Sequence, residues 1–278
     1  MPSSKGYRDL ESGRMGGGIS ALLNECLGTF FIAWALFGTS SFNLVAVGAM
    51  LTFFTYFEAD GQYNPAITVS TMLGKDASTS VRTGLLAILA QAVGATVAFV
   101  LNNQMGGDYL QAVGAGDLPA ATNDMLIVIV LLLTYACDSS GLGRGLSYFS
   151  ALSAFPSAGG ANSAIVLGGV IANAAMGNGL DLSTGMLVST ITPLVAAALF
   201  GLLAGTISSA LGTTVANEGG GTFFFALMSF AISSNADAAS APLALGATLY
   251  TVSVAWKNAT YNPAITIAKL AKSRSYDT

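Results

Sequence analysis

The sequence contains no histidine, and only 9% of its 278 residues are charged. Without histidine it lacks the usual general base of a Ser-His-Asp catalytic set and the commonest metal ligand. It also has no Gly-rich phosphate loop and no cysteine or histidine spacing typical of a metal site. We therefore expect no enzymatic activity, no cofactor, no metal ion and no nucleic-acid partner.

Cysteine is scarce as well, because the chain holds only Cys26 and Cys137. Both fall in or at the ends of apolar runs, where a packed thiol is more common than a disulfide or a metal ligand. The start of the chain also lacks the basic segment, short apolar run and small-residue cleavage site of a signal peptide. We expect residues 1–18 to form a polar tail that stays in the compartment where it was made.

Apolar residues are abundant: 53% of the chain is hydrophobic and the mean hydropathy is +0.65. A helix needs about 20 residues to cross the hydrocarbon core of a bilayer, and several apolar runs reach that length. A large soluble core would require outer helices with polar faces, and most of these runs have none. The composition therefore predicts an all-α membrane protein.

The apolar runs follow one order that appears twice and then begins a third time. Each full unit reads as helix, helix, half-helix and helix, which indicates an internal repeat. The long runs cover about 19–38, 42–57 and 83–102 in the first unit, 124–137, 145–156 and 186–209 in the second, and 219–233 and 242–256 in the third.

Within this repeat the hexapeptide Tyr-Asn-Pro-Ala-Ile-Thr occurs twice, at residues 63–68 and 261–266. Asparagine is a strong helix N-cap and proline is favoured at the first helical position, so each copy predicts a short helix. Such a helix points its free N–H groups, and the positive end of its dipole, toward whatever precedes it. The predicted cap residues are Asn64, Pro65 and Ala66 in the first copy and Asn262, Pro263 and Ala264 in the last.

A degenerate copy of the motif, Asn162-Ser163-Ala164, stands at the corresponding place in the second unit. By itself the surrounding Gly-Gly-Ala-Asn-Ser stretch is typical of an ordinary loop. Its position in the repeat favours a half-helix instead, with serine in place of proline. Each unit also opens with an asparagine followed by an acid, and these acids are Glu25, Asp124 and Glu218.

The positions of the positive charges favour a topology with eight crossings and three half-helices. That topology places the N-terminal tail, the 58–82 loop, the 138–144 link and the C-terminal tail on one side, and these segments hold all 10 Lys and Arg residues. Lys and Arg gather in short cytoplasmic loops. We therefore expect a multi-pass protein with both termini on the cytoplasmic or stromal side.

The half-helix motifs and their flanking residues resemble the aquaporin or major intrinsic protein family. The stretch 24–30 is similar to that family's first-helix pattern of Glu, a spacer and Gly-Thr, and residues 61–63 fit the loop before its first motif. Pro193-Leu194 resembles part of its sixth helix. The resemblance covers 19–210 as one channel unit, made of repeats 19–102 and 123–210, and leaves 211–278 as a partial third repeat with a basic C-terminal tail.

The resemblance implies an inverted repeat of six transmembrane helices and two half-helices, followed here by two extra helices and a third half-helix. It implies a passive channel for water or a small neutral solute, in which Asn64 and Asn162 offer N–H donors to the solute. It further implies that Glu25 and Asp124 are structural acids that accept hydrogen bonds from loop backbone, with Glu218 at the same place in the third unit. Proton relay is the alternative role, for which a chain without histidine offers few partners.

The constriction departs from the family pattern. The family usually has an Arg three residues after the second motif's asparagine, whereas this chain has Ile165. By approximate alignment Val47 is the second-helix member of the constriction, and the fifth-helix member lies between Leu146 and Ser150. Such an apolar constriction would pass small neutral solutes or close by dewetting.

The third unit is a larger departure, because it has the orientation of the first. Its motif lacks an inverted partner unless the second and third units pair instead, an arrangement that would lack a closing helix. An unwound loop exposed to lipid is costly. We therefore expect 211–278 to be covered within a homo-oligomer or a larger membrane complex, or to lie at the lipid headgroups. Two alternatives to a channel stay open: a non-conducting structural subunit of such a complex, and a secondary active transporter.

Overall fold

The computed structural model of the chain describes residues 18–37, 43–74, 79–105, 118–137, 140–157, 159–180, 183–210 and 214–256. These residues form ten α-helices and no strand. The helices are α2 (Ile19–Phe37), α3 (Asn43–Phe57), α4 (Pro65–Leu73), α5 (Val81–Gln104), α6 (Leu118–Cys137), α7 (Gly141–Ala154), α8 (Ser163–Ala175), α9 (Thr184–Ala210), α10 (Thr214–Asn235) and α11 (Ala241–Ala255).

Most helix bounds lie within a few residues of those expected from the apolar runs, but α6, α7 and α10 begin earlier. Helix α7 begins at Gly141 because Ser140 caps it, with the Ser140 Oγ accepting a hydrogen bond from Gly143 N at 3.1 Å. This glycine-rich first turn has little hydropathy signal. Helix α6 begins at Leu118 and has Pro119 in its first turn, where proline is well tolerated.

In the part of the chain that the structure describes, four helices are long and apolar enough to cross a membrane: Ile19–Phe37, Val81–Gln104, Pro119–Ala136 and Thr184–Leu203. Large apolar side chains on their outer surfaces are exposed, for example Leu89 (62%) and Leu202 (68%). A soluble protein rarely leaves so much contiguous apolar surface in water. The described part of the chain is thus an all-α protein with the surface of a membrane protein, while the count of eight crossings stays a prediction.

Glycines face a neighbouring helix at two close helix crossings. Helix α2 packs along α5, and a Cβ atom at Gly94 would lie 2.0 Å from the backbone oxygen of Cys26. Helix α3 packs along α7, where a Cβ at Gly145 would lie 2.2 Å from the backbone oxygen of Gly48. Small residues at such crossings are the usual way in which membrane helices pack.

We predict that Gly94→Ala lowers the free energy of unfolding by about 2–3 kcal/mol, because the added methyl group must push α2 away from α5. The matched control is Gly246→Ala in α11, where a new Cβ would meet no atom within 4 Å. Alanine is the better helix former, so this control should be neutral or stabilise by up to about 1 kcal/mol. Unfolding titrations in mild detergent check both variants, and equal stabilities would contradict the close packing.

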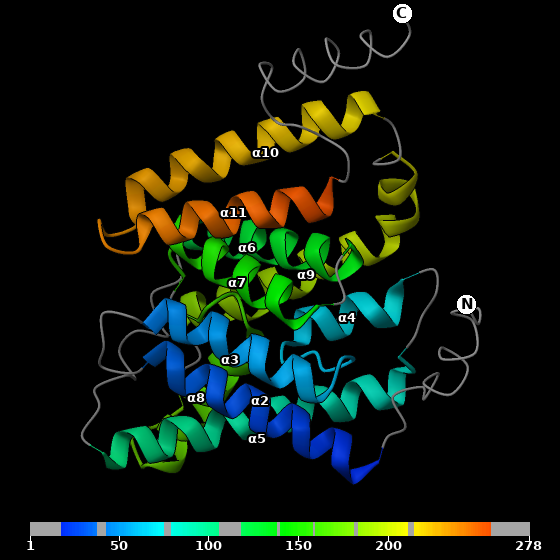
Figure 1. The fold of residues 1–278 in the computed structure, drawn as a ribbon. Helices are drawn as coiled ribbons and strands as arrows, with labels where there is room; N and C mark the ends of the chain where they lie inside the picture. The colour runs from blue at the N-terminus through cyan, green and yellow to red at the C-terminus, as the bar shows by residue number, and fades with distance from the viewer. Residues whose placement is uncertain are drawn as a thin grey trace, which may run out of the picture.

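Helices α10 and α11, the described part of the third unit, lie side by side against α6 and α7 (Figure 1). The hydroxyl groups of Ser150 in α7 and Thr248 in α11 are hydrogen-bonded to each other. Asn235, the last residue of α10, donates its Nδ2–H to Ala154 O at 2.9 Å. The chain itself therefore covers one face of this extra helix pair.

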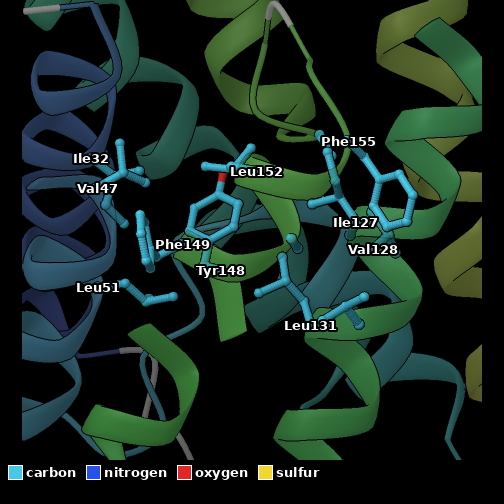
Figure 2. Close-up of a cluster of buried hydrophobic side chains, with 14 of the residues drawn as sticks. Ile32, Val47, Leu51, Ile127, Val128, Leu131, Tyr148, Phe149, Leu152 and Phe155 are labelled. Carbon is cyan, nitrogen blue, oxygen red and sulfur yellow. The ribbon is translucent and has the colours of Figure 1, made fainter. Parts of the chain in front are cut away.

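A buried apolar cluster lies between α3 and α6. Figure 2 shows the ring of Tyr148 between Val47 and Leu51 on one side and Ile127 and Leu131 on the other. All five side chains are almost fully buried. This cluster fixes the wall of helices beside the two half-helices α4 and α8.

Candidate functional site

Helices α4 and α8 begin with the same cap. Asn64 Oδ1 accepts a hydrogen bond from Ala66 N at 2.9 Å, and Asn162 Oδ1 accepts one from Ala164 N at 3.1 Å. Both asparagines have extended backbone, as N-caps require. The degenerate second motif, Asn162-Ser163-Ala164, therefore begins a helix in the same manner as Asn64-Pro65-Ala66.

Serine replaces proline in the second motif, so the fixed φ of a proline ring is lost. The serine hydroxyl supplies another constraint. Ser163 Oγ donates to Thr190 O in α9 at 2.7 Å. In the first motif, Pro65 occupies the first helical position instead. The start of α8 is thus tied to its neighbour by a side-chain bond rather than by a proline ring.

The two half-helices meet at their N-termini through a reciprocal pair of hydrogen bonds. Asn64 Nδ2 donates to Ala161 O at 3.2 Å, and Asn162 Nδ2 donates to Tyr63 O at 2.8 Å. Each amide thus binds the carbonyl that precedes the other asparagine. This exchange relates the two motifs as the halves of a local two-fold arrangement.

The residues just before the asparagines also match in backbone conformation. Tyr63 has φ 53° and Ala161 has φ 52°, both in the left-handed region that non-glycine residues seldom adopt. Such a conformation costs about 1–3 kcal/mol and persists only where surrounding contacts fix it. It aims the carbonyl of each residue at the opposite asparagine.

Glu25 supplies the contacts that hold the left-handed backbone of Tyr63 before the first motif. Its Oε1 accepts from Gln62 N at 2.7 Å, and its Oε2 accepts from Tyr63 N and Gln91 Nε2, each at 2.7 Å. Glu25 is only 2% exposed. All three partners are N–H donors, which is the arrangement expected of a structural acid that holds loop backbone.

Asp124 supports the second motif through an intermediate. Its Oδ1 accepts a hydrogen bond from Ser157 Oγ. Ser157 Oγ in turn accepts a hydrogen bond from Ala161 N at 2.9 Å. Aspartate is one methylene shorter than glutamate, so the serine hydroxyl bridges the remaining distance to the loop. Glu25 and Asp124 thus fix Tyr63 and Ala161, one directly and the other through Ser157, a residue that the sequence did not single out.

The Tyr63 side chain fills the space beside the first motif. Its hydroxyl accepts from Asn24 Nδ2 at 2.7 Å and donates to Phe54 O at 2.9 Å. A Cβ at Gly28 would lie 2.3 Å from the Tyr63 ring, so only glycine leaves room for it. This packing explains in structural terms why a tyrosine precedes Asn64.

A small cavity lies where the half-helices meet, with about 10 Å³ open to the centre of a water molecule. That is close to the minimum space for one water. Its wall is mostly aromatic and aliphatic, and Gln62, Asn64 and Asn162 are the lining residues that carry amide groups. The lining residues are Ile32, Leu51, Gln62, Tyr63, Asn64, Ile67, Leu131, Tyr135, Tyr148 and Asn162.

The four constriction candidates from the sequence do not line this cavity. Val47 and Ile165 are fully buried in the packed core, and Leu146 is partly buried. Ser150 is hydrogen-bonded to Thr248, so its hydroxyl faces α11 and not the cavity. From α7 it is Tyr148 that borders the cavity instead.

Arg144 is a buried cation at the start of α7. It is 7% exposed, its Nη1 donates to Ala59 O at 2.6 Å, and its guanidinium lies 4.1 Å from the centre of the Tyr135 ring. Tyr135 is itself part of the cavity wall. The sequence indicates only that Arg144 lies in a connecting link. It contains no signal that this side chain is buried against the 58–82 loop.

We predict that Arg144→Met lowers the free energy of unfolding by about 1–3 kcal/mol, because the loop carbonyl loses its donor and Tyr135 loses its cation. Arg82→Met is the matched control, since Arg82 is exposed on α5, and it should change stability by less than about 0.5 kcal/mol. Thermal unfolding in detergent measures both. A wild-type melting curve for Arg144→Met would show that the guanidinium holds nothing in place.

The third motif, Asn262, Pro263 and Ala264, lies outside the described residues. Glu218 lies near the start of α10 and is half-buried. Among the described residues no group of three or more His, Cys, Asp or Glu is placed to hold a metal ion.

Searches against protein-family models and against curated proteins find no match to this chain. The geometry of the site therefore carries the functional argument alone.

Proposed function

We propose that residues 19–210 form an aquaporin-like inverted repeat that acts as a passive channel for water or small neutral solutes. The observation that carries this proposal is the reciprocal pair of bonds from Asn64 Nδ2 to Ala161 O and from Asn162 Nδ2 to Tyr63 O. Two half-helices that meet in this way place their caps at one point between α2, α3, α6 and α7.

The chemistry of that point suits a neutral solute. Two helix N-termini face it, and each contributes roughly half a positive charge from its aligned peptide dipoles. Each asparagine amide makes one hydrogen bond through its nitrogen within the described residues, which leaves one N–H of Asn64 and one of Asn162. These donors bind an oxygen or nitrogen lone pair, while the positive field disfavours a passing cation.

The proposal also explains why non-helical backbone is buried here. Residues 61–63 and 159–161 are not helical, and such backbone at membrane depth must be enclosed by protein or line a wet cavity. Glu25, Ser157 and the exchanged asparagine amides satisfy several of its N–H and C=O groups. The fold thus meets a strict condition for broken helices in lipid.

Stopped-flow light scattering on proteoliposomes tests this function. We expect faster volume change than in empty vesicles for water and for at least one of glycerol, urea and ammonia. Dissipating ion gradients should leave these rates unchanged, which separates a channel from a secondary transporter. Rates equal to those of empty vesicles for every solute would refute the proposal.

A second candidate function is a non-conducting subunit of a larger membrane complex. The specific observation in its favour is the small cavity of about 10 Å³, whose wall includes the side chains of Tyr63, Tyr135 and Tyr148. Purification in mild detergent distinguishes the two: a stoichiometric partner protein favours the subunit, and a free monomer or homo-oligomer favours the channel. In either case we propose a multi-pass protein with both termini on the cytoplasmic or stromal side.

A further inference from the structure

We propose that Gln62 Oε1 is the acceptor of a single-solute site in the cavity between the half-helices. This inference rests on the proposed function and narrows its substrate to molecules that both donate and accept hydrogen bonds, such as water and ammonia. Gln62 lines the cavity together with Asn64 and Asn162, and it is 4% exposed.

The hydrogen bonds of Gln62 fix the orientation of its amide. Its Nε2 donates to Thr71 Oγ1 at 2.8 Å and to Thr79 Oγ1 at 3.2 Å. Thr71 already donates its hydroxyl proton to Thr68 O at 2.9 Å, so it can only accept from Gln62. The nitrogen must therefore point toward Thr71, and Oε1 must point away from it.

That oxygen has no hydrogen-bond partner among the described residues. A buried carbonyl oxygen without a donor costs about 1–3 kcal/mol, and such a group in a native protein needs an explanation. The cavity beside it offers one, because Gln62 lies in its wall together with Asn64 and Asn162, and the cavity has room for about one water. A solute that donates a hydrogen bond to Gln62 Oε1 removes the free-energy cost of the unpaired oxygen.

The remaining groups of the cavity complete the site. Within the described residues Asn64 and Asn162 each keep one free N–H, and both residues line the same cavity as Gln62. A water there can accept from the two asparagines and donate to Gln62, which gives about three hydrogen bonds, the usual number for a buried water. A solute with no proton to donate leaves Gln62 Oε1 unpaired and is disfavoured.

Gln91 shows that burial of a glutamine amide alone does not make such a site. It also lies in the network of Glu25 and also has an unpartnered Oε1 within the described residues. It is not part of the cavity wall. The distinguishing property of Gln62 is therefore its position beside the two asparagines.

Two variants of Gln62 distinguish its role as a hydrogen-bond acceptor for the solute from its role as a donor that ties the loop to Thr71 and Thr79. Methionine removes both the acceptor and the N–H donors, whereas glutamate keeps an oxygen acceptor but cannot make both donations to Thr71 and Thr79. We expect the water permeability per molecule to fall about fivefold in Gln62→Met, the loss of about one hydrogen bond, and to stay within about twofold of wild type in Gln62→Glu. Equal losses in both variants would show that Gln62 acts only as a tether, and an unchanged Gln62→Met would overturn the site.

An experimental density map of the wild-type protein, at a resolution that shows ordered water, tests the site without any conduction. We expect a water within hydrogen-bond distance of Gln62 Oε1 and of an Nδ2 atom of Asn64 or Asn162. If wild-type vesicles conduct nothing but this water is present, the channel proposal fails and the site stands. An empty cavity, or a protein donor at Gln62 Oε1, overturns the site.

Discussion

Replacing Glu25 with alanine is expected to lower the free energy of unfolding by about 3–5 kcal/mol, because three buried N–H donors then lose their acceptor. The donors are Gln62 N, Tyr63 N and Gln91 Nε2. The left-handed backbone of Tyr63 also loses the contact that holds it. Among the predictions for single residues, this one has the largest effect.

Glutamine at position 25 should cost about half as much, since one of its amide atoms can still accept while the other faces an N–H. The matched control is Glu58→Gln, an acid just before the loop whose half-buried side chain makes no hydrogen bond within the described residues. It should change stability by less than about 0.5 kcal/mol. Chemical unfolding in mild detergent measures all three variants, and a Glu25→Ala protein as stable as the Glu58→Gln control would refute the structural role of the acid.

The second large effect concerns the junction of the half-helices. Asn64→Ala and Asn162→Ala should each cost about 2–3 kcal/mol, from the lost cap and the lost donation to the opposite carbonyl. In the double variant the total should fall short of the sum by about 1–2 kcal/mol, because the first substitution already loosens the junction.

Ser80→Ala serves as the reference for the loss of a helix cap that does not contact the other half-helix. Ser80 Oγ accepts a hydrogen bond from Thr83 N at the exposed start of α5. It should cost about 1 kcal/mol and add independently to Asn64→Ala. Unfolding free energies of the four proteins in each cycle decide the matter. If Asn64→Ala and Asn162→Ala are additive to within about 0.5 kcal/mol, the two helix ends do not support each other.

The caps of both half-helices could be predicted from the sequence because their cause is local. Asn64 and Asn162 begin α4 and α8 where the repeat placed them, and the substitution of serine for proline did not prevent it. Glu25 could be predicted as a structural acid near the loop from the family resemblance, because an acid stands at the same place in each repeat. Local signals of this kind need only a few neighbouring residues.

The wall of the cavity could not be predicted, because it depends on how distant helices pack. Ser150 faces Thr248 of α11, and nothing in either helix indicates that α11 lies against α7. Tyr148 borders the cavity because the α7 helix turns that face inward. Ser157 was overlooked for a similar reason, since its bond to Asp124 joins residues 33 positions apart.

Gln62 illustrates a third kind of limit. In the sequence it lies two residues before Asn64, within a loop that resembles the family pattern and that gives the glutamine itself no special role. Its importance follows from the threonines that occupy its nitrogen, Thr71 and Thr79, and from the oxygen that they leave unpaired within the described residues. An orphaned atom appears only when all of its surroundings are placed.

The central claim is that two facing half-helices form a positive, hydrogen-bonding point past which neutral solutes move in single file. The most direct test measures water and proton permeability on the same wild-type proteoliposomes, against empty vesicles of the same lipid. We predict water permeability clearly above the empty vesicles and proton permeability equal to theirs. Water permeability no higher than in empty vesicles, or a proton leak that rises together with it, would contradict the account.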